Sequence, residues 1–459
     1  MLGLGDTGLS MTRWLARQGA VVSVADTRAA PPAARQLADE LPQVRVRTGA
    51  FRREDFAQAD MIAVSPGIDP RTGELAAAIQ RGMPVVGDIE LFARALRVRN
   101  DTGKEQSRAK VIAITGSNGK STVTRMCGDI CASAGFVTEV AGNIGQPVLD
   151  VMCDIEDGRR MPDAFVLELS SFQLETISSL EPDAATLLNL SEDHMDRYDG
   201  FAEYGAAKAR IFAGLEKEAG VQVLNRDDEY SLSTWCAGRR LTTFGLSAPL
   251  SAHEWGLSGA QETLALAHGD SPLVRVSELP LAGLHNAANA LAAGALCDAI
   301  GIGHAPITRA LRAFKGLPHR VENINKINEI EFYDDSKGTN VGATVAALKG
   351  MQQPVVLIAG GDGKGQNFSP LAEAARRARA VVLIGRDAAL IAHALASTGV
   401  ILLRAGDMVE AVDMAYRSAT PGDAVLLSPA CASYDMFRSY VHRAQVFAEA
   451  VAQLARRVG

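Results

Sequence analysis

The sequence predicts an α/β fold made of three domains in series, each built on a mainly parallel β-sheet. Short apolar runs rich in β-branched residues alternate with helical stretches along the 459 residues, as expected for parallel strands joined by helices. One hydrophobic core normally serves about 100–200 residues, so a chain of this length needs two or three. A polar stretch near residue 100 and a Gly-Leu-Pro segment divide the chain into residues 1–98, 99–317 and 318–459.

The first domain is expected to alternate two strands with two helices before a linker. We expect strands at Val21–Val24 and Met61–Val64, and helices at Thr12–Gln18 and Gly73–Arg81. The polar segment Arg97–Lys110 contains an Asn-Asp-Thr-Gly sequence, and these residue types favour turns. We therefore interpret it as the linker to the second domain.

The central domain opens with an apolar strand and carries two long, alanine-rich helices of regular periodicity. Its expected strands are Val111–Thr115, Phe165–Leu169, Ala184–Leu190 and Val221–Leu224, and its expected helices are Lys120–Ala134 and Ala287–Ala299. Gly316 and Pro318 end the domain, because both residue types interrupt helices and strands.

The third domain again alternates strands with helices. Its strands are nearly continuous apolar runs, which is typical of a parallel sheet covered on both faces. The expected strands are Ile330–Tyr333, Val355–Ala359, Ala380–Ile384, Val400–Leu403 and Ala424–Leu427, and the expected final helix begins near Ser433.

Composition and charge argue against several classes of function. The net charge is −7 and the pI is about 5.7, whereas proteins that bind a nucleic-acid backbone usually carry a basic surface. None of the six cysteines forms a C-x-x-C pair, so we expect reduced thiols rather than a zinc site. No apolar run approaches the about 20 residues of a membrane span, and the first residues lack the pattern of a signal peptide. We expect a cytoplasmic monomer without nucleic-acid or membrane partners.

A glycine-rich loop between the first strand and first helix of the central domain indicates nucleotide binding. It consists of Gly116, Ser117, Asn118, Gly119, Lys120, Ser121 and Thr122. In this position the backbone N–H groups and the positive end of the helix form an anion site. Lys120 is suited to the β- and γ-phosphates and Ser121 to Mg²⁺. The loop is shorter than the usual G-x-x-x-x-G-K-[ST], and the alternative interpretation is a glycine turn capped by a hydroxyl.

Three further residues follow this loop in the sequence, and Glu168 and His194 allow two interpretations each. Glu168 stands in an apolar strand, where a carboxylate needs a metal ion or a salt bridge. Ser191 and the acids after it fit a helix N-cap, so His194 fits either a ligand or an ordinary helix residue. Lys208, judged by residue type alone, is a solvated helix lysine.

Taken together, the motifs resemble the Mur ligase family over essentially the whole chain. TGSNGKST, LELSSFQLE, NLSEDHMDRY, the lysine of AAKARIF, GLHNAANALAA, LPHR and DDSKGTN occur in the family's order. Within the family the chain is most similar to the D-glutamate-adding members, on the basis of GLGDTG, DSKGTN, GGDGKGQNF and SPACASYDMF. The Asp-Asn-Pro-Arg motif of the diamino-acid-adding relatives is absent from the sequence.

The resemblance implies a Rossmann-like first domain that binds a uridine nucleotide, a P-loop ATPase-like centre and a Rossmann-like third domain that binds an amino acid. It implies an enzyme of peptidoglycan precursor synthesis with the substrates UDP-N-acetylmuramoyl-L-alanine, D-glutamate and ATP. ATP would phosphorylate the terminal carboxylate of the sugar nucleotide, and the amine of D-glutamate would then displace the phosphate. Two Mg²⁺ ions and a carbamate derived from CO₂ are the implied cofactors.

The resemblance also assigns roles to individual residues. The implied catalytic residues are Lys120, Glu168, His194, Lys208 and Lys337. ATP contacts are implied for the glycine-rich loop and for Asn286, Asn289, His319, Arg320 and Asp335. Contacts to the UDP substrate are implied for Gly5, Asp6, Thr7, Asp26, Arg28, Ser65, Pro66, Gly67, Asn143 and His194. Contacts to D-glutamate are implied for Thr339, Lys364, Ser433 and Tyr440. The implied metal ligands are Ser121, Glu168, His194 and carbamylated Lys208.

Some of these residues keep a simpler explanation. Asn286 also fits a helix cap, and Ser433 also fits the cap of the last helix. Asn367 stands where relatives often have Asp, and Tyr440 stands where many have Phe. These two differences concern the details of the amino-acid pocket.

The first residues offer a competing hypothesis. Gly3, Gly5 and Gly8 match G-x-G-x-x-G, and Asp26 lies at the distance expected of a ribose-binding acid. A nicotinamide-dependent dehydrogenase would fit this pattern, although the phosphate loop has no role in hydride transfer. A nucleotide-dependent switch that hydrolyses ATP without a ligase reaction is the third hypothesis.

A strand should precede this glycine fingerprint, yet only Met1 and Leu2 stand before Gly3. A start assigned too late or a shortened chain would produce this pattern. We expect the loss of most of that strand to weaken the first domain and its binding of uridine.

Overall fold

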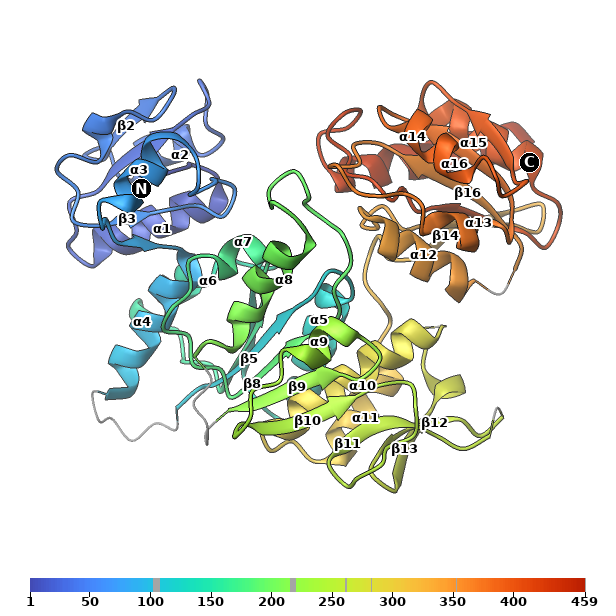
Figure 1. The fold of residues 1–459 in the computed structure, drawn as a ribbon, viewed down its shortest axis with the longest axis horizontal. Coiled ribbons are helices and arrows are strands. Elements are labelled where there is room, and N and C mark those ends of the chain that lie inside the picture. Colours follow the sequence, from blue (N-terminus) through green and yellow to red (C-terminus); the bar gives the residue numbers. More distant parts are fainter. Residues whose placement is uncertain (102–107, 215–219, 261, 282, 352, 459) are drawn as a thin grey trace.

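The computed structural model describes residues 1–101, 108–214, 220–260, 262–281, 283–351 and 353–458. Figure 1 shows three lobes, with the first and last parts of the chain on either side above a larger central lobe. Each lobe combines β-sheet with helices, so the predicted α/β class is confirmed. In the part of the chain that the structure describes, no helix is long and apolar enough to cross a membrane.

The N-terminal lobe contains two small parallel sheets joined by a single residue. Its strands are β1 (Ser23–Asp26), β2 (Arg45–Thr48), β3 (Ile62–Ala63) and β4 (Val85–Val86). Its helices are α1 (Asp6–Arg17), η1 (Arg53–Asp55), α2 (Ala34–Glu40), α3 (Gly73–Gln80) and α4 (Asp88–Asp101). Leu2 is buried and forms parallel bridges to Ala25 and Val64. Residues 1–3 therefore occupy the position of the expected strand before the glycine fingerprint.

Two predictions for this lobe need correction. The first strand begins at Ser23, two residues later than predicted. Val21 is fully exposed, and pairing with β2 begins only at Ser23. The predicted linker begins as helix, since α4 continues to Asp101. Phe92 of α4 packs edge-on against Phe165 of the central lobe, with ring centroids 5.0 Å apart.

The central lobe is built on a nine-stranded sheet with the order β13-β12-β11-β10-β9-β8-β5-β7-β6. Its strands are β5 (Lys110–Thr115), β6 (Thr138–Gly142), β7 (Ala164–Glu168), β8 (Ala184–Leu187), β9 (Val221–Asn225), β10 (Arg240–Phe244), β11 (Glu254–Ser258), β12 (Ala265–His268) and β13 (Ser271–Arg275). Its helices are α5 (Lys120–Ser133), α6 (Val148–Glu156), α7 (Ser171–Leu174), α8 (Phe201–Ala209), η2 (Arg210–Phe212), α9 (Glu229–Ser233), η3 (Val276–Glu278), α10 (Leu284–Ala299) and α11 (His304–Ala313). The sheet is parallel except at β12 and β13.

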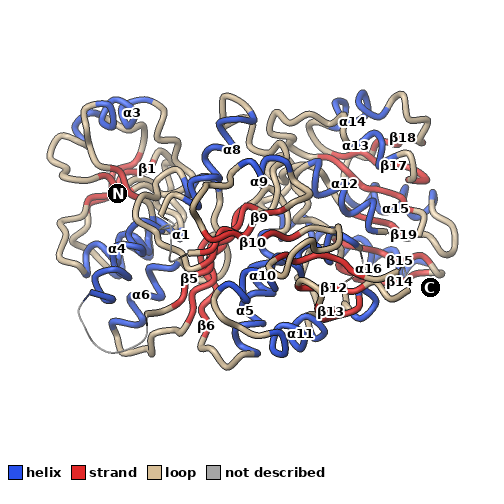
Figure 2. The backbone as a smooth tube through the Cα atoms, turned by 60° about the horizontal axis from the view of Figure 1, so that its bottom comes forward, coloured by secondary structure: helices blue, strands red, loops and turns tan. Residues whose placement is uncertain are grey.

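The apolar alternation of β5 explains how this sheet is covered on both faces. Ile112 and Ile114 pack in the core with α5 and α10, whereas Val111 and Ala113 pack in the core with α4 and α6. Figure 2 shows the strands between these two groups of helices. Because both faces are buried, the loops at the carboxyl ends of the strands are the parts of the sheet available to a ligand.

The C-terminal lobe has a six-stranded sheet with the order β14-β15-β19-β16-β17-β18, parallel except for β14. Its strands are β14 (Glu322–Ile327), β15 (Ile330–Asp334), β16 (Val355–Gly360), β17 (Ala378–Ile384), β18 (Ile401–Arg404) and β19 (Ala424–Leu427). Its helices are α12 (Val341–Gly350), α13 (Leu371–Ala375), α14 (Ala388–Leu395), α15 (Met408–Ser418) and α16 (Tyr440–Val458).

The predicted start of the last helix at Ser433 is wrong. α16 begins at Tyr440, and residues 433–439 form turns in which the Ser433 carbonyl accepts hydrogen bonds from the amides of Met436 and Phe437. The hydroxyl of Ser439 accepts from the His442 amide at 3.1 Å and caps the helix instead.

Candidate functional site

The glycine-rich loop has the geometry of an anion-binding turn. It connects β5 to α5, and Gly116 and Gly119 have φ angles of 152° and 83°, which disfavour other residues. The Nζ atom of Lys120 folds back over the loop and donates to the carbonyl oxygens of Gly116 at 2.8 Å and Ser117 at 2.9 Å. A bound phosphate is more negative than a carbonyl oxygen and can replace these two carbonyl oxygens as the partner of the ammonium group.

Lys208 is a buried part of the same loop. Its side chain is 2% exposed, and its Nζ atom donates to the carbonyl oxygen of Gly116 at 2.9 Å. The interpretation as a solvated lysine is therefore wrong. Burial lowers the pKa of Lys208 well below its ordinary value, and the neighbouring charge of Lys120 lowers it further. Burial also lowers the pKa of Lys120.

Glu168 supplies a carboxylate that the protein satisfies only in part. It ends β7 and is 1% exposed. Its Oε1 atom accepts a hydrogen bond from Nδ2 of Asn143 at 2.8 Å, whereas its buried Oε2 atom has no protein partner. The charge of Glu168 acts against burial on the pKa of Lys120 and on that of Lys208. An unpaired carboxylate oxygen of this kind fits a divalent cation, which prefers oxygen ligands.

The segment after β8 is a loop, and the helix cap predicted at Ser191 is wrong. The amide of Ser191 donates to Oγ of Ser117 at 2.9 Å, and the Ser117 hydroxyl donates back to the Ser191 carbonyl at 2.8 Å. Ser191 therefore packs against the phosphate loop, and residues 191–200 form loop and turns instead of starting a helix. Figure 1 shows this segment rising between the two outer lobes.

His194 lies in this loop with a left-handed backbone, at φ 57°. Its ring packs 4.8 Å from the ring of Phe172, measured between centroids. Burial is the main cause that lowers the pKa of His194, to about 4, so the imidazole is neutral near pH 7. A neutral imidazole is the form that ligates a metal ion. The strained backbone, rare outside glycine, is typical of functional positions.

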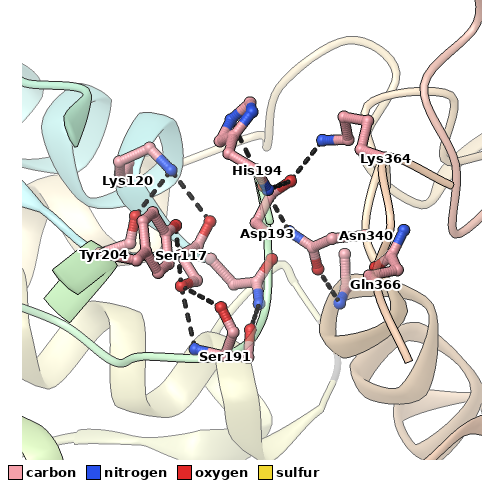
Figure 3. A network of polar contacts seen from close by, with 12 residues as sticks. Ser117, Lys120, Ser191, Asp193, His194, Tyr204, Asn340, Lys364 and Gln366 are labelled. Carbon is pink, nitrogen blue, oxygen red and sulfur yellow. Dashed lines mark hydrogen bonds and ion pairs between the residues drawn. The ribbon is translucent and has the colours of Figure 1, made fainter. Parts of the chain in front are cut away.

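Polar contacts join this loop to the C-terminal lobe (Figure 3). Asp193 is 7% exposed, forms an ion pair with Lys364 and accepts from Nδ2 of Asn340 at 3.2 Å. A second contact lies at the start of α5, where Nη2 of Arg320 donates to Oγ of Ser121 at 3.1 Å. The structure thus brings two predicted residues of the C-terminal lobe to the central lobe: Lys364 to the loop after β8 and Arg320 to the end of the phosphate loop.

The start of α10 also lies against the phosphate loop. A Cβ atom added at Gly119 would come within 2.5 Å of Oδ1 of Asn289, which places that amide next to the loop. The N-cap of α10 is Gly283, so the alternative role of Asn286 as a cap is wrong. Asn289 lies 3.4 Å from the Asn286 side chain, measured from Nδ2 to Oδ1.

The next group of predicted residues lies near the ends of strands in the C-terminal lobe. Asp335 follows β15, is 5% exposed and accepts from Oγ of Ser428 at 2.6 Å. Burial raises the pKa of Asp335 to about 7. Nζ of Lys337 donates to the hydroxyl of Tyr440 at 3.3 Å. Nδ1 of His319 lies 2.7 Å from a carboxylate oxygen of Asp334.

The remaining residues predicted to bind D-glutamate lie on the same edge of that sheet. Thr339 follows β15, Lys364 follows β16 and Ser433 follows β19. These strands are neighbours in the sheet. Their loops therefore lie side by side at the carboxyl ends of parallel strands, the usual ligand position in this type of fold.

The N-terminal lobe gathers most residues predicted to bind the UDP substrate. A Cβ atom added at Gly3 would lie 3.0 Å from Cβ of Ser65, so the glycine turn and the turn at residues 65–67 are adjacent. Both carboxylate oxygens of Asp26 already accept hydrogen bonds, from Arg28 and from the Leu4 amide. The Arg28 hydrogen bonds are the main cause that lowers the pKa of Asp26 to about 2.

Two members of the predicted UDP set lie elsewhere. Asn143 and His194 belong to the central lobe, where Asn143 contacts Glu168 and His194 lies beside Asp193. Gly5 is the N-cap of α1, and Asp6 and Thr7 are the first residues of that helix. The site is thus spread over all three lobes.

Sequence reasoning missed Asp193 as a link between lobes and Ser191 as a partner of Ser117. Both were interpreted as parts of a helix N-terminus, for which Ser and acidic residues are also typical. The apolar periodicity that a helix would show is missing after Ser191. This absence is the signal that could have identified the segment as a loop.

Three family models match the chain. They describe a Mur ligase MurD-like N-terminal domain at residues 1–87, a Mur ligase middle domain at residues 114–297 and a Mur ligase glutamate ligase domain at residues 319–431. The chain is 55% identical to UDP-N-acetylmuramoylalanine–D-glutamate ligase of Methylobacillus flagellatus, over 100% of this chain and 97% of the relative. It is 56% identical to the protein of the same name in Thiobacillus denitrificans, over 99% of this chain and 96% of the relative.

Solved structures share the fold at low sequence identity. UDP-N-acetylmuramate-alanine ligase MurC of Thermotoga maritima superposes with a TM-score of 0.59 at 18% identity, covering 98% of this chain and 99% of that one. A pseudomurein peptide ligase type C from Methanothermus fervidus gives a TM-score of 0.54 at 19% identity, covering 93% and 96%. These likenesses support the three-lobed α/β architecture.

Proposed function

Because this chain belongs to the Mur ligase family, we propose that it joins D-glutamate to UDP-N-acetylmuramoyl-L-alanine with cleavage of ATP to ADP and phosphate. The observation that carries the proposal is full-length identity of 55–56% to ligases that bear this name. The name of these relatives describes a ligase that joins UDP-N-acetylmuramoylalanine to D-glutamate. The reaction belongs to the synthesis of peptidoglycan precursors.

The reaction needs ATP because an unactivated carboxylate is a poor electrophile. A carboxylate oxygen of the alanine attacks the γ-phosphorus of ATP, and ADP leaves. The amine of D-glutamate attacks the resulting acyl phosphate and loses a proton, and the tetrahedral intermediate releases inorganic phosphate and leaves the amide. Catalysis of such steps rests on alignment and charge stabilisation.

Lys120 is proposed to hold the β- and γ-phosphates, since its ammonium group already lies over the loop. Arg320, within hydrogen-bond distance of Ser121, adds a second positive charge from the C-terminal lobe. Asn289 lies next to Gly119 and is proposed, together with Asn286, His319 and Asp335, to contact the rest of the nucleotide. Lys337 is proposed to stabilise the transferred phosphoryl group.

Mg²⁺ ions are proposed to bind at Ser121, Glu168, His194 and modified Lys208. The unpaired Oε2 atom of Glu168 and the neutral imidazole of His194 support this set. When bound, Mg²⁺ neutralises negative charge that develops on the phosphates.

Lys208 is proposed to carry a carbamate formed from CO₂. Only a neutral amine adds CO₂, and burial next to Lys120 favours the neutral form of Lys208. The addition forms a nitrogen–carbon bond and releases the amine proton, which replaces a cation by an anionic oxygen ligand. That oxygen suits a hard cation.

D-glutamate carries two carboxylates, so its pocket needs cations and hydroxyl groups. Lys364, Thr339, Ser433 and Tyr440 supply them near the carboxyl ends of β15, β16 and β19. In this structure the ammonium group of Lys364 is paired with Asp193. We propose that a substrate carboxylate replaces Asp193 as the partner of this ammonium group.

The UDP moiety is proposed to bind the glycine turn of the N-terminal lobe. Asp26 holds the turn through the Leu4 amide and fixes Arg28, whose side chain is 50% exposed and is proposed to contact a phosphate. Ser65, Pro66 and Gly67 form the opposite side. Because the oxygens of Asp26 are already engaged, a role for Asp26 as the ribose acid of a dehydrogenase is disfavoured.

The test is phosphate release with UDP-N-acetylmuramoyl-L-alanine, ATP and Mg²⁺, with a panel of D- and L-amino acids. The proposal expects release that depends on D-glutamate. Slow hydrolysis indifferent to amino acids would favour the switch hypothesis. Hydride transfer with NAD(P)H and no need for ATP would favour the dehydrogenase.

A further inference from the structure

Three loops of the C-terminal lobe carry the residues proposed to bind D-glutamate. Thr339 follows β15, Lys364 follows β16 and Ser433 follows β19, whereas the fourth residue, Tyr440, begins α16. Each loop is held by its own strand, but a pocket for one small molecule needs the three loops in a fixed relation. Positions held to about 0.5 Å require supporting contacts behind the binding residues.

One buried arginine on α16 connects two of these loops. Arg443 is fully buried, and its Nη2 atom donates to the Ser336 carbonyl at 2.7 Å while its Nη1 atom donates to the Cys431 carbonyl at 3.0 Å. Ser336 directly precedes Lys337, and Cys431 lies two residues before Ser433. The planar guanidinium therefore fixes the spacing of these two loops.

The third loop is fixed through the second. The backbones of Ala432 and Asp362 exchange hydrogen bonds of 2.8 and 3.0 Å, and Oδ1 of Asp362 accepts from the Lys364 amide at 2.9 Å. Lys364 itself has a left-handed backbone, at φ 52°. A shift of the loop after β19 would thus displace the ammonium group of Lys364.

Tyr440 completes the connection. It begins α16 one turn before Arg443, so the two side chains lie on the same side of the helix. Its hydroxyl accepts from Nζ of Lys337 at 3.3 Å. All four residues proposed to bind D-glutamate are therefore connected to the helix or loops that Arg443 holds.

Arg443 also places a positive charge behind the loops after β15 and β19. Its Nε atom is buried without a hydrogen-bond partner. Burial lowers the pKa of Arg443 to about 10, although the nearby carboxylates of Asp435, Asp334 and Asp335 oppose this shift, so the guanidinium stays charged at neutral pH. Burying a charge is costly, and the carboxylates of bound D-glutamate would offset part of that cost.

We infer that Arg443 is a positioning residue for the amino-acid substrate: its guanidinium braces the loops after β15 and β19 and supplies positive charge under the D-glutamate pocket. This inference rests on the proposed function. It concerns D-glutamate first and ATP second, because the loop after β15 also carries Asp335 and Lys337. It does not concern the UDP substrate, because the glycine turn of the N-terminal lobe makes no hydrogen bond with Arg443 in the described structure.

The test compares Arg443→Lys and Arg443→Met with the wild-type enzyme. Lysine keeps the charge but cannot bond two carbonyls in one plane, and methionine removes both properties. The matched control is Arg457→Met on the same helix, where Arg457 is exposed and pairs with Asp413. For each protein, KM is measured separately for D-glutamate, ATP and the UDP substrate, together with the thermal midpoint.

We expect KM for D-glutamate to rise about tenfold in Arg443→Lys and further in Arg443→Met, with KM for ATP rising less and KM for the UDP substrate within about twofold. The Arg457→Met enzyme should match the wild type. An unchanged KM for D-glutamate in Arg443→Lys would overturn the inference, as would an equal rise of all three KM values. If Arg443→Met fails to fold, the KM values of Arg443→Lys alone decide. Absence of D-glutamate-dependent activity in the wild type would instead contradict the proposed function.

Discussion

Burial sets the chemistry of individual residues at this site. Lys208 and Lys120 both donate to the Gly116 carbonyl, at 2.9 and 2.8 Å. Two ammonium groups on one carbonyl oxygen, away from water, oppose each other's charge. The neutral amine of Lys208 is therefore a consequence of how α8 packs on the phosphate loop, and it favours carbamylation.

Lys208→Ala should lower ligase activity at least about 100-fold, because a metal ligand and its charge are lost. Formate or acetate should restore part of the activity by placing a carboxylate in the space left by the side chain. Phosphate release at saturating substrates measures both effects. Lys349→Ala, at an exposed position of α12, is the control and should remain active. Full activity of unrescued Lys208→Ala would contradict the role as a metal ligand.

Asp335 should make stability depend on pH, because burial raises its pKa from 3.8 to about 7. Between these two values the folded protein holds a proton that the unfolded chain has lost. The stabilisation is complete below about pH 4 and disappears as the pH rises through 7. Three pKa units correspond to at most about 4 kcal/mol.

Asp335→Asn has no carboxyl proton to lose. The thermal midpoint of Asp335→Asn minus that of the wild type should therefore increase from pH 5 to pH 8, because only the wild type loses this stabilisation. A difference between the two proteins that does not change with pH would contradict the raised pKa.

Among the secondary-structure elements, the glycine fingerprint shows how a short motif fixes a helix. Gly3 has φ 84°, and a Cβ atom added at Gly8 would lie 1.9 Å from the Gly3 carbonyl oxygen. Such close contact leaves space only for hydrogen. α1 can therefore approach the turn closely, and its first residues face the proposed UDP site.

Gly8→Ala should force α1 away from the turn and destabilise the N-terminal lobe by about 1–3 kcal/mol, the usual cost of overpacking. KM for the UDP substrate should rise, whereas KM for ATP should change little. Gly303→Ala is the control, since no atom lies within 4 Å of an added Cβ there. A Gly8→Ala protein with the wild-type KM for the UDP substrate would contradict the prediction and show that this packing does not affect substrate binding.

Across the whole molecule, the outer lobes are attached to the central lobe in different ways. α1 of the N-terminal lobe forms ion pairs with α6, between Arg17 and Glu156 at 2.7 Å and between Arg13 and Asp150 at 3.3 Å, and α4 packs through Phe92. The C-terminal lobe is joined by the polar contacts of Asp193 and Arg320. Polar contacts of this kind exchange readily with water or substrate, so we expect the C-terminal lobe to move more easily.

Asp193→Asn removes the negative charge that pairs with Lys364. Without substrates, the distance between the central and C-terminal lobes should become larger or more broadly distributed, as measured by small-angle scattering or by fluorescence transfer between labelled lobes. Asp196→Asn, an exposed position of the same loop, should leave the distribution unchanged. An identical distribution for Asp193→Asn and wild type would mean that other contacts hold the lobes.

The sequence also determined much of the fold through local patterns. β5, β7, β16, β17 and β19 lie within two residues of their predicted bounds, because apolar runs between turn residues are a local signal. The phosphate loop was predicted for the same reason, since strand, glycine turn and helix follow one another. The strands of the antiparallel edge, β12 and β13, were missed because they are short and partly polar.

Tertiary structure decided the rest of the site. Lys208 bonds to a residue 92 positions away, Asp193 to one 171 positions away and Arg320 to one 199 positions away. No periodicity of the chain reports such pairs, and by residue type a lysine or serine is assigned to the surface or to a helix cap. The sequence by itself determined many individual strands and the nucleotide loop, which depend on neighbours in the chain. Only the packed structure decided which charges are buried together, because burial depends on residues that folding brings into contact.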